Sequence, residues 1–205
     1  MSMTRRGVQL LGGLWLFGAS VALLVRADLG LDPWDVLHQG ISAHTGVSIG
    51  LVVIVVSVFV LALWVPLRQR PGAGTLANAV LVGLFLDATL TVLPVPTALL
   101  YRVAFLVVGV IGNAAATGLY IGARLGPGPR DGLMTGLAAR GVSIRVARTA
   151  IEVTVLVAGW LLGGGVGVGT IAYALAIGPL AQAFITLFTI PNPQEKHHET
   201  AHHHR

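Results

Sequence analysis

The chain has 205 residues, of which 55% are hydrophobic and only 10% are charged, and its mean hydropathy is +0.82. This balance excludes an ordinary water-soluble domain and predicts an all-α, polytopic membrane protein. The formal net charge of +5 comes from arginines between apolar stretches, which suits an anionic lipid surface, so we expect no nucleic-acid partner. Because the chain has no cysteine, it offers neither a disulfide nor a thiol site.

Six apolar stretches are long enough to cross the hydrocarbon core of a bilayer, which takes about 20 helical residues. The first stretch follows Arg5 and Arg6. We interpret it as a membrane span and not as a cleaved leader, because it has no clear small-residue cleavage site and belongs to an internal repeat. The six predicted spans lie near residues 7–25, 47–66, 74–93, 101–122, 146–163 and 168–190.

A polar motif follows the first span and returns after the fourth. Residues 27–43 read ADLGLDPWDVLHQGISA, and residues 123–139 read ARLGPGPRDGLMTGLAA, with eight identical positions. The similarity continues on both sides of the motif, with a one-residue deletion downstream. The sequence therefore predicts one membrane domain, residues 1–190, that contains a first repeat of about 5–96 and a second of about 101–190.

The orientation of the two repeats follows from their span number. Each repeat has three spans, an odd number, so the second must enter the membrane upside down relative to the first. With the N-terminus in the cytoplasm, Arg26 and Arg102 are the only two of the 13 basic residues on the outer side. We therefore expect a 3+3 inverted repeat with both termini in the cytoplasm, an arrangement found in many secondary transporters.

Each copy of the motif has the signals of a helix start. In the first copy, Asp32 suits the N-cap, Pro33 suits the first helical position, and Asp35 lies in the first turn, where the positive end of the helix dipole favours a carboxylate. The same three places are filled in the second copy by Gly128, Pro129 and Asp131. About twelve residues are too few to cross a bilayer, so each copy is predicted to form a half-helix that is re-entrant or lies on the surface.

Two interpretations of these half-helices stay open. In one, their N-termini face a shared polar cavity; in the other, they are interfacial caps that only stabilise short loops. The copies also differ, because Trp34 is replaced by Arg130 and His38 by Met134. A symmetric site is therefore not expected. Arg130 is a candidate contact for an anionic group, or an anchor on the positive cytoplasmic side.

Polar residues inside the predicted spans are the other candidates, because an ionisable group within a membrane is costly. Asp87 in the third span is a candidate ion or proton site, or else the acceptor of a hydrogen bond between helices. Asn113 and Gln182 either join helices or line a cavity. Glu152 is four residues from Arg148, which favours a structural ion pair.

Small residues indicate where helices approach closely. Ala79 and Gly83 in the third span return as Ala174 and Gly178 in the sixth. We expect these small-xxx-small pairs to bring the third and sixth spans into contact.

The C-terminal segment 191–205 contains five of the seven histidines. A divalent metal is one interpretation, and a disordered cytoplasmic or artificial terminus is the other. The rest of the sequence has no catalytic triad, zinc-binding helix or phosphate loop. We therefore expect no enzyme, no cofactor and no metal site.

A family resemblance rests on four segments: GLDPWDVL at residues 30–37, GPGPRDGL at 126–133, and the GT-x-x-A-x-A segments that start at Gly74 and Gly169. Together they resemble the bacterial YczE/YyaS/YitT family of multi-pass membrane proteins over about residues 5–190. The resemblance implies an inner-membrane location and six or fewer spans. It implies neither an agreed substrate nor a catalytic role for any residue.

The leading hypothesis is a permease that moves a small solute or ion by alternating access, coupled through Asp87, Asp35 or Asp131. The second is a scaffold or regulator that does not transport and binds a partner protein. A third is a substrate-capturing subunit that needs a separate ATPase. The expected partners are the lipid bilayer and a small solute or ion, with a homo-oligomer or a partner membrane protein left open.

Overall fold

The structure is a computed structural model, and it describes residues 3–190. The histidine-rich segment 191–205, with its predicted disorder and the alternative of metal binding, lies outside the described residues. Within 3–190, every regular element is an α-helix. The elements are α1 (Met3–Ala27), α2 (Pro33–Thr45), α3 (Ile49–Trp64), α4 (Ala73–Val92), α5 (Leu99–Gly122), α6 (Pro129–Ala138), α7 (Ile144–Leu161) and α8 (Val168–Phe188).

Four of these helices, α1, α4, α5 and α8, are long and apolar enough to cross a bilayer. Helices α2 and α3 are bent by 115° at the short break between them and together form a fifth candidate. The chain is therefore a multi-pass helical membrane protein. The predicted second and fifth spans correspond to α3, with only 16 residues, and to α7, with 18 residues that include Arg145, Arg148 and Glu152.

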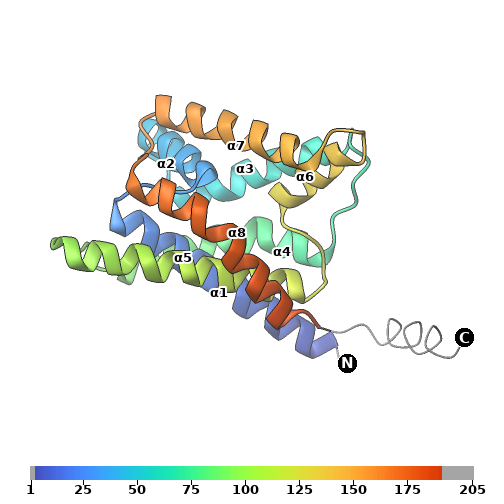
Figure 1. The fold of residues 1–205 in the computed structure, drawn as a ribbon, viewed down its shortest axis with the longest axis horizontal. Helices are drawn as coiled ribbons and strands as arrows, with labels where there is room; N and C mark the ends of the chain where they lie inside the picture. Colours follow the sequence, from blue (N-terminus) through green and yellow to red (C-terminus); the bar gives the residue numbers. More distant parts are fainter. Residues whose placement is uncertain (1–2, 191–205) are drawn as a thin grey trace, which may run out of the picture.

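The helices form two layers (Figure 1). Helices α1, α4, α5 and α8 lie in one layer, and α2, α3, α6 and α7 lie in the other. In the first layer α1 packs against α4 and α5, and α5 also packs against α8. In the second layer the short helix of each repeat packs against the long helix of the other, α2 on α7 and α6 on α3. The two predicted half-helices are thus embedded in contacts between the repeats.

Matching connectors precede the two short helices. Asp28 and Arg124 have φ values of 50° and 54°, and Gly30 and Gly126 have φ values of 111° and 123°. Any side chain at either glycine would also meet atoms of the opposite repeat at 2.6 Å, so the position requires glycine for both reasons.

Backbone hydrogen bonds fasten each connector to the other repeat. The amide of Gly169 donates to the carbonyl of Leu29 at 2.7 Å, and the amide of Gly74 donates to the carbonyl of Leu125 at 2.8 Å. These donors belong to the two GT-x-x-A-x-A segments of the sequence. Equivalent positions of the two repeats therefore make equivalent contacts.

The repeats differ in how their last two long helices pack. Helix α3 lies tightly on α4, where Gly83 meets the backbone of Gly50. The Asp87 carboxylate of α4 accepts hydrogen bonds from the Ser48 hydroxyl at 2.6 Å and from the Gly50 amide at 2.8 Å. We call this arrangement the α3–α4 latch.

The equivalent helices α7 and α8 have at most a marginal contact within the described part of the chain. Gly178, the equivalent of Gly83, has no atom within 4 Å of the place where a Cβ would be. The predicted contact between the third and sixth spans, α4 and α8, is therefore wrong: Gly83 meets α3, and Gly178 faces open space. The motif indicates close approach but does not specify the partner helix.

Candidate functional site

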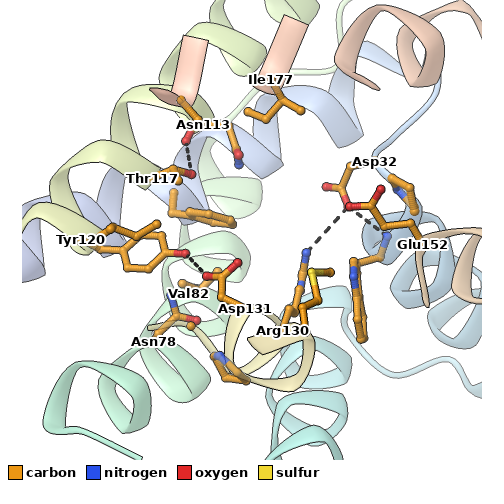
Figure 2. A pocket seen from close by; sticks show the side chains of 18 of the residues that line it. Asp32, Asn78, Val82, Asn113, Thr117, Tyr120, Arg130, Asp131, Glu152 and Ile177 are labelled. Carbon is orange, nitrogen blue, oxygen red and sulfur yellow. Dashed lines mark hydrogen bonds and ion pairs between the residues drawn. The ribbon is translucent and has the colours of Figure 1, made fainter. Parts of the chain in front are cut away.

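A cavity of about 280 Å³ lies between the two layers, and all eight helices or their N-caps contribute to its walls. Figure 2 shows its interior, with Asp32 and Arg130 on one side and Tyr120 and Asp131 on the other. The starts of α2 and α6 come from opposite repeats and both reach this cavity. Its wall includes Asp32, Pro33, Trp34, Gly128, Pro129, Arg130 and Asp131.

The start of α2 is held by a side-chain cap. Asp32 occupies the N-cap position, and its carboxylate accepts hydrogen bonds from the amides of Trp34 and Asp35 at 2.9 and 3.2 Å. Pro33 takes the first helical position. The Asp32 side chain is buried, so its charge is placed inside the protein by the same local signals that start the helix.

The start of α6 is held by packing, because its N-cap, Gly128, has no side chain to cap with. The indole N–H of Trp64 donates to the carbonyl of Pro129 at 3.0 Å, and Gly132 lies directly against the same ring. Asp131, in the first turn, accepts a hydrogen bond from the Tyr120 hydroxyl at 2.5 Å. The carboxylate of the second motif is thus tied to α5.

Arg130 connects the two helix starts. Its guanidinium lies 3.7 Å from an oxygen of Asp32 and 3.6 Å from an oxygen of Asp35, and its carbon is 5.1 Å from the centre of the Trp34 ring. These ion-pair distances exceed those of a hydrogen bond. The guanidinium is therefore surrounded by two carboxylates and an aromatic face without a short bond to any of them.

Behind this pair, Asp35 is bound to His38 of the same helix. The two side chains are each 1% exposed, and His38 Nδ1 lies 2.8 Å from Asp35 Oδ1. The other carboxylate oxygen, Asp35 Oδ2, is buried and has no hydrogen-bond partner within residues 3–190. A buried oxygen of this kind is expected to be satisfied by water or by a bound molecule.

The opposite wall is formed by α5 and α8. The Tyr173 hydroxyl of α8 donates to Asn113 Oδ1 of α5 at 2.9 Å, and the Asn113 amide nitrogen has no partner in the described residues. Gln182 also lines the cavity. Both interpretations of Asn113 thus apply, since it joins two helices and faces the cavity.

Two sequence candidates are not part of the cavity wall: Asp35 is buried beside Arg130, and Asp87 contacts α3. Asp87 belongs to the α3–α4 latch, beside a shallow depression that includes Ser48 and Thr91. Glu152 lies at the cavity and is paired with Arg148 at 2.9 Å. The pairing favoured by their sequence spacing is therefore present.

Three residues that sequence reasoning did not select belong to the site: His38, Tyr120 and Tyr173. Comparison of the repeats offers a signal for the tyrosines. In the alignment of the two repeats, Tyr120 is equivalent to Leu24, and Tyr173 is equivalent to Asn78. Each tyrosine thus marks a position where the two repeats have side chains of different chemistry. Such exchanges are expected where a duplicated scaffold has acquired an asymmetric site.

The charges of the site do not balance. Two carboxylates, those of Asp32 and Asp35, stand beside the one guanidinium of Arg130, and a third, that of Asp131, lines the cavity on the other side. Arg148 and Glu152 compensate each other. Among the described residues, no three His, Asp or Glu side chains are grouped so that they could hold a metal ion.

Comparison with known sequences identifies the family. Residues 4–186 match a family of unknown function, DUF6198. The chain belongs to this family. No solved structure matches the chain.

Three relatives come from two bacteria. A Haemophilus influenzae protein named only as uncharacterized is 42% identical over 190 residues, which cover 91% of this chain and 87% of the relative. The uncharacterized membrane protein YczE of Bacillus subtilis is 32% identical over 177 residues, 85% of this chain and 80% of YczE. YyaS of Bacillus subtilis is 25% identical over 182 residues, 85% of this chain and 90% of YyaS. The resemblance to the YczE/YyaS family is thus confirmed.

Proposed function

We propose that this DUF6198 protein is a permease of the bacterial inner membrane that moves a small solute by alternating access. The observation that supports this most directly is the meeting of the α2 and α6 starts at one cavity, where Arg130 of one repeat lies between Asp32 and Asp35 of the other. Interrupted helices from inverted halves form the solute site of many secondary transporters. The cavity volume of about 280 Å³ suits a small solute.

The proposal includes a 3+3 inverted repeat in which α3 and α7 are the short second span of each half. The paired connectors support it, because Leu29 and Leu125 bind the opposite repeat through equivalent backbone bonds. The arginine distribution supports a cytoplasmic position for both termini.

Alternating access would follow from the difference between the two repeats. The α3–α4 latch holds α3 against α4, while α7 and α8 have at most a marginal contact. If the repeats exchange these arrangements, α7 approaches α8, the latch opens, and the cavity faces the other side of the membrane. Asp87 then acts as a residue that stabilises one of two states, and Asp35 or Asp131 would couple an ion or proton to the solute.

Flux measurements test the role of the site. The protein is reconstituted into liposomes, and proton flux and uptake from a mixture of small solutes are followed with a pH-sensitive dye and by mass spectrometry. Asp35→Asn and Asp131→Asn are expected to reduce flux, while Asp28→Asn, an exposed residue outside the cavity, serves as the matched control. Equal flux in all variants, or a stoichiometric protein partner together with no flux, would contradict the proposal and favour the scaffold hypothesis.

Cross-linking tests the exchange of states. The chain has no cysteine, so introduced pairs report without background. Ser48→Cys with Asp87→Cys should lock the latch, because these side chains already touch at 2.6 Å. The equivalent pair, Ser143→Cys with Gln182→Cys, should cross-link only during turnover. A chain that transports while both pairs stay cross-linked would refute alternating access.

A further inference from the structure

We infer that the solute bound between α2 and α6 is a small organic cation, with an ammonium group placed among the carboxylates and aromatic rings of the cavity. This inference rests on the proposed function for the location of the site, and it adds the chemical class of the solute. Four properties of the described residues support it: the unbalanced charge, the environment of Arg130, the aromatic lining, and a buried oxygen without a partner.

The unbalanced charge favours a positively charged ligand. Asp32 is 4% exposed and Asp35 is 1% exposed, so bulk water hydrates neither side chain. Among residues 3–190, Arg130 is the one cation paired with both of them, and Asp131 adds a third carboxylate on the other side of the cavity. Buried charges without compensation are costly, especially in a membrane. A bound cation would reduce that cost, whereas an anion would increase it.

The environment of Arg130 shows which kind of cation the site can hold. The guanidinium is a delocalised organic cation, and it lies over the Trp34 ring at 5.1 Å while two carboxylates stand at 3.6 and 3.7 Å. No short hydrogen bond fixes it, so a second cation would compete with it for the same two carboxylates. Asp35 Oδ2, which is buried and has no partner in the described residues, belongs to one of these carboxylates.

The aromatic lining distinguishes an organic cation from a metal or alkali ion. Four rings reach the cavity, those of Phe17, Trp34, Tyr120 and Tyr173. Ammonium groups bind aromatic faces through cation–π attraction, and cages of this composition recognise quaternary ammonium. An inorganic cation requires several oxygen ligands at about 2.0–2.6 Å. Across residues 3–190 no cluster of three acidic or histidine side chains offers that, and the cavity is far wider than one ion.

An anionic or zwitterionic solute fits less well. The cap of α2 is already occupied by the Asp32 carboxylate, and the first turn of α6 contains the Asp131 carboxylate. The amide ends of both helices, which would otherwise attract an anion, thus have negative charge beside them. A solute carboxylate near either end would meet like charge.

Binding of three probes of nearly equal size tests the inference. Choline has a quaternary ammonium group, 3,3-dimethylbutan-1-ol is its neutral isostere, and glycine betaine adds a carboxylate. The full-length chain in liposomes is titrated with radiolabelled choline, and the other two are used as competitors. We expect saturable choline binding, with no competition from the neutral alcohol and competition from betaine that is weaker by about tenfold or more.

Two variants connect the binding to the site. Asp131→Asn keeps the shape of the side chain and an oxygen for the Tyr120 hydroxyl, so it is expected to fold and to weaken choline binding by about tenfold or more. Asp131→Glu should restore most of the binding. Asp28→Asn, whose native side chain is 77% exposed, should bind like the native chain.

The outcomes separate this inference from the proposed function. Choline binding without flux would support the solute class and contradict transport. Flux of a neutral or anionic solute with no choline binding would support transport and overturn the inference. Absence of choline binding, equal competition by the neutral alcohol, or betaine binding at least as tight as choline would each overturn it.

Discussion

Two equivalent glycines, Gly83 and Gly178, should respond to the same substitution to very different extents. An alanine Cβ at position 83 would lie 2.3 Å from the carbonyl oxygen of Gly50 and 2.7 Å from a side-chain carbon of Ile54. Because the nearest atom belongs to the backbone, α3 and α4 would have to separate. At position 178, no atom lies within 4 Å of the same Cβ.

The magnitude follows from overpacking and from the latch. Forcing an extra methyl into a packed helix contact costs about 1–3 kcal/mol. Separation of the helices would also lengthen the bond between the Gly50 amide and the Asp87 carboxylate, now 2.8 Å. A hydrogen bond to a charged group is worth about 1.5–3 kcal/mol, and the higher helix propensity of alanine returns up to about 1 kcal/mol. We expect Gly83→Ala to lower the free energy of unfolding by about 2–4 kcal/mol.

For Gly178→Ala we expect a change within about 0.5 kcal/mol of zero, because Pro179 follows and reduces the helix-propensity gain. Reversible unfolding in mixed micelles, followed by the fluorescence of the four tryptophans, measures both variants. Equal losses in the two variants, or a larger loss at position 178, would refute the described packing. In liposomes, Gly178→Ala should still reduce flux, because a transporting chain must bring α7 against α8.

Further predictions concern the connectors and the site. Thr75→Val should lower the free energy of unfolding by about 1–3 kcal/mol, because the Thr75 hydroxyl donates to the Pro127 carbonyl at 2.7 Å; a stability equal to that of the native chain in the same micelle assay would contradict the connector contact. Asp32→Ala should cost about 1–2 kcal/mol through loss of the N-cap, whereas Asp32→Asn should retain the cap and most of the stability, so equal losses would argue against capping. Tyr120→Phe should reduce flux without unfolding the chain, since it removes the hydrogen bond to Asp131, and unchanged flux would exclude that bond from transport.

The sequence predicted the local features of this fold well. The short helices begin at Pro33 and Pro129 because the cap, the proline and the first-turn carboxylate lie within four residues of one another, and such signals act locally. The family and the membrane class also followed from the sequence, from the motifs and from composition. Helix α7 lies within two residues of its predicted bounds, but three charged residues interrupt its apolar pattern and it is not among the candidate membrane spans.

The partners of each helix were not predictable in the same way. Gly83 and Gly178 each follow an alanine by four residues, yet one meets α3 and the other faces open space. The relevant difference lies in the opposing helix, where Gly50 is replaced by Arg145 in the second repeat. For the candidate site, one of the two hypotheses expected both helix starts to face a shared cavity, and the starts of α2 and α6 do reach one cavity. Nothing local indicated that Asp87 would turn toward Ser48.

The bond between the Gly169 amide and the Leu29 carbonyl has a consequence for biogenesis. Leu29 leaves the ribosome early, whereas Gly169 lies in the first turn of α8 and is made about 140 residues later. The first connector must therefore enter the membrane with its carbonyl unsatisfied and wait for most of the chain to be synthesised. A nascent chain that stops before residue 169 would leave this carbonyl without its partner, which is costly in lipid.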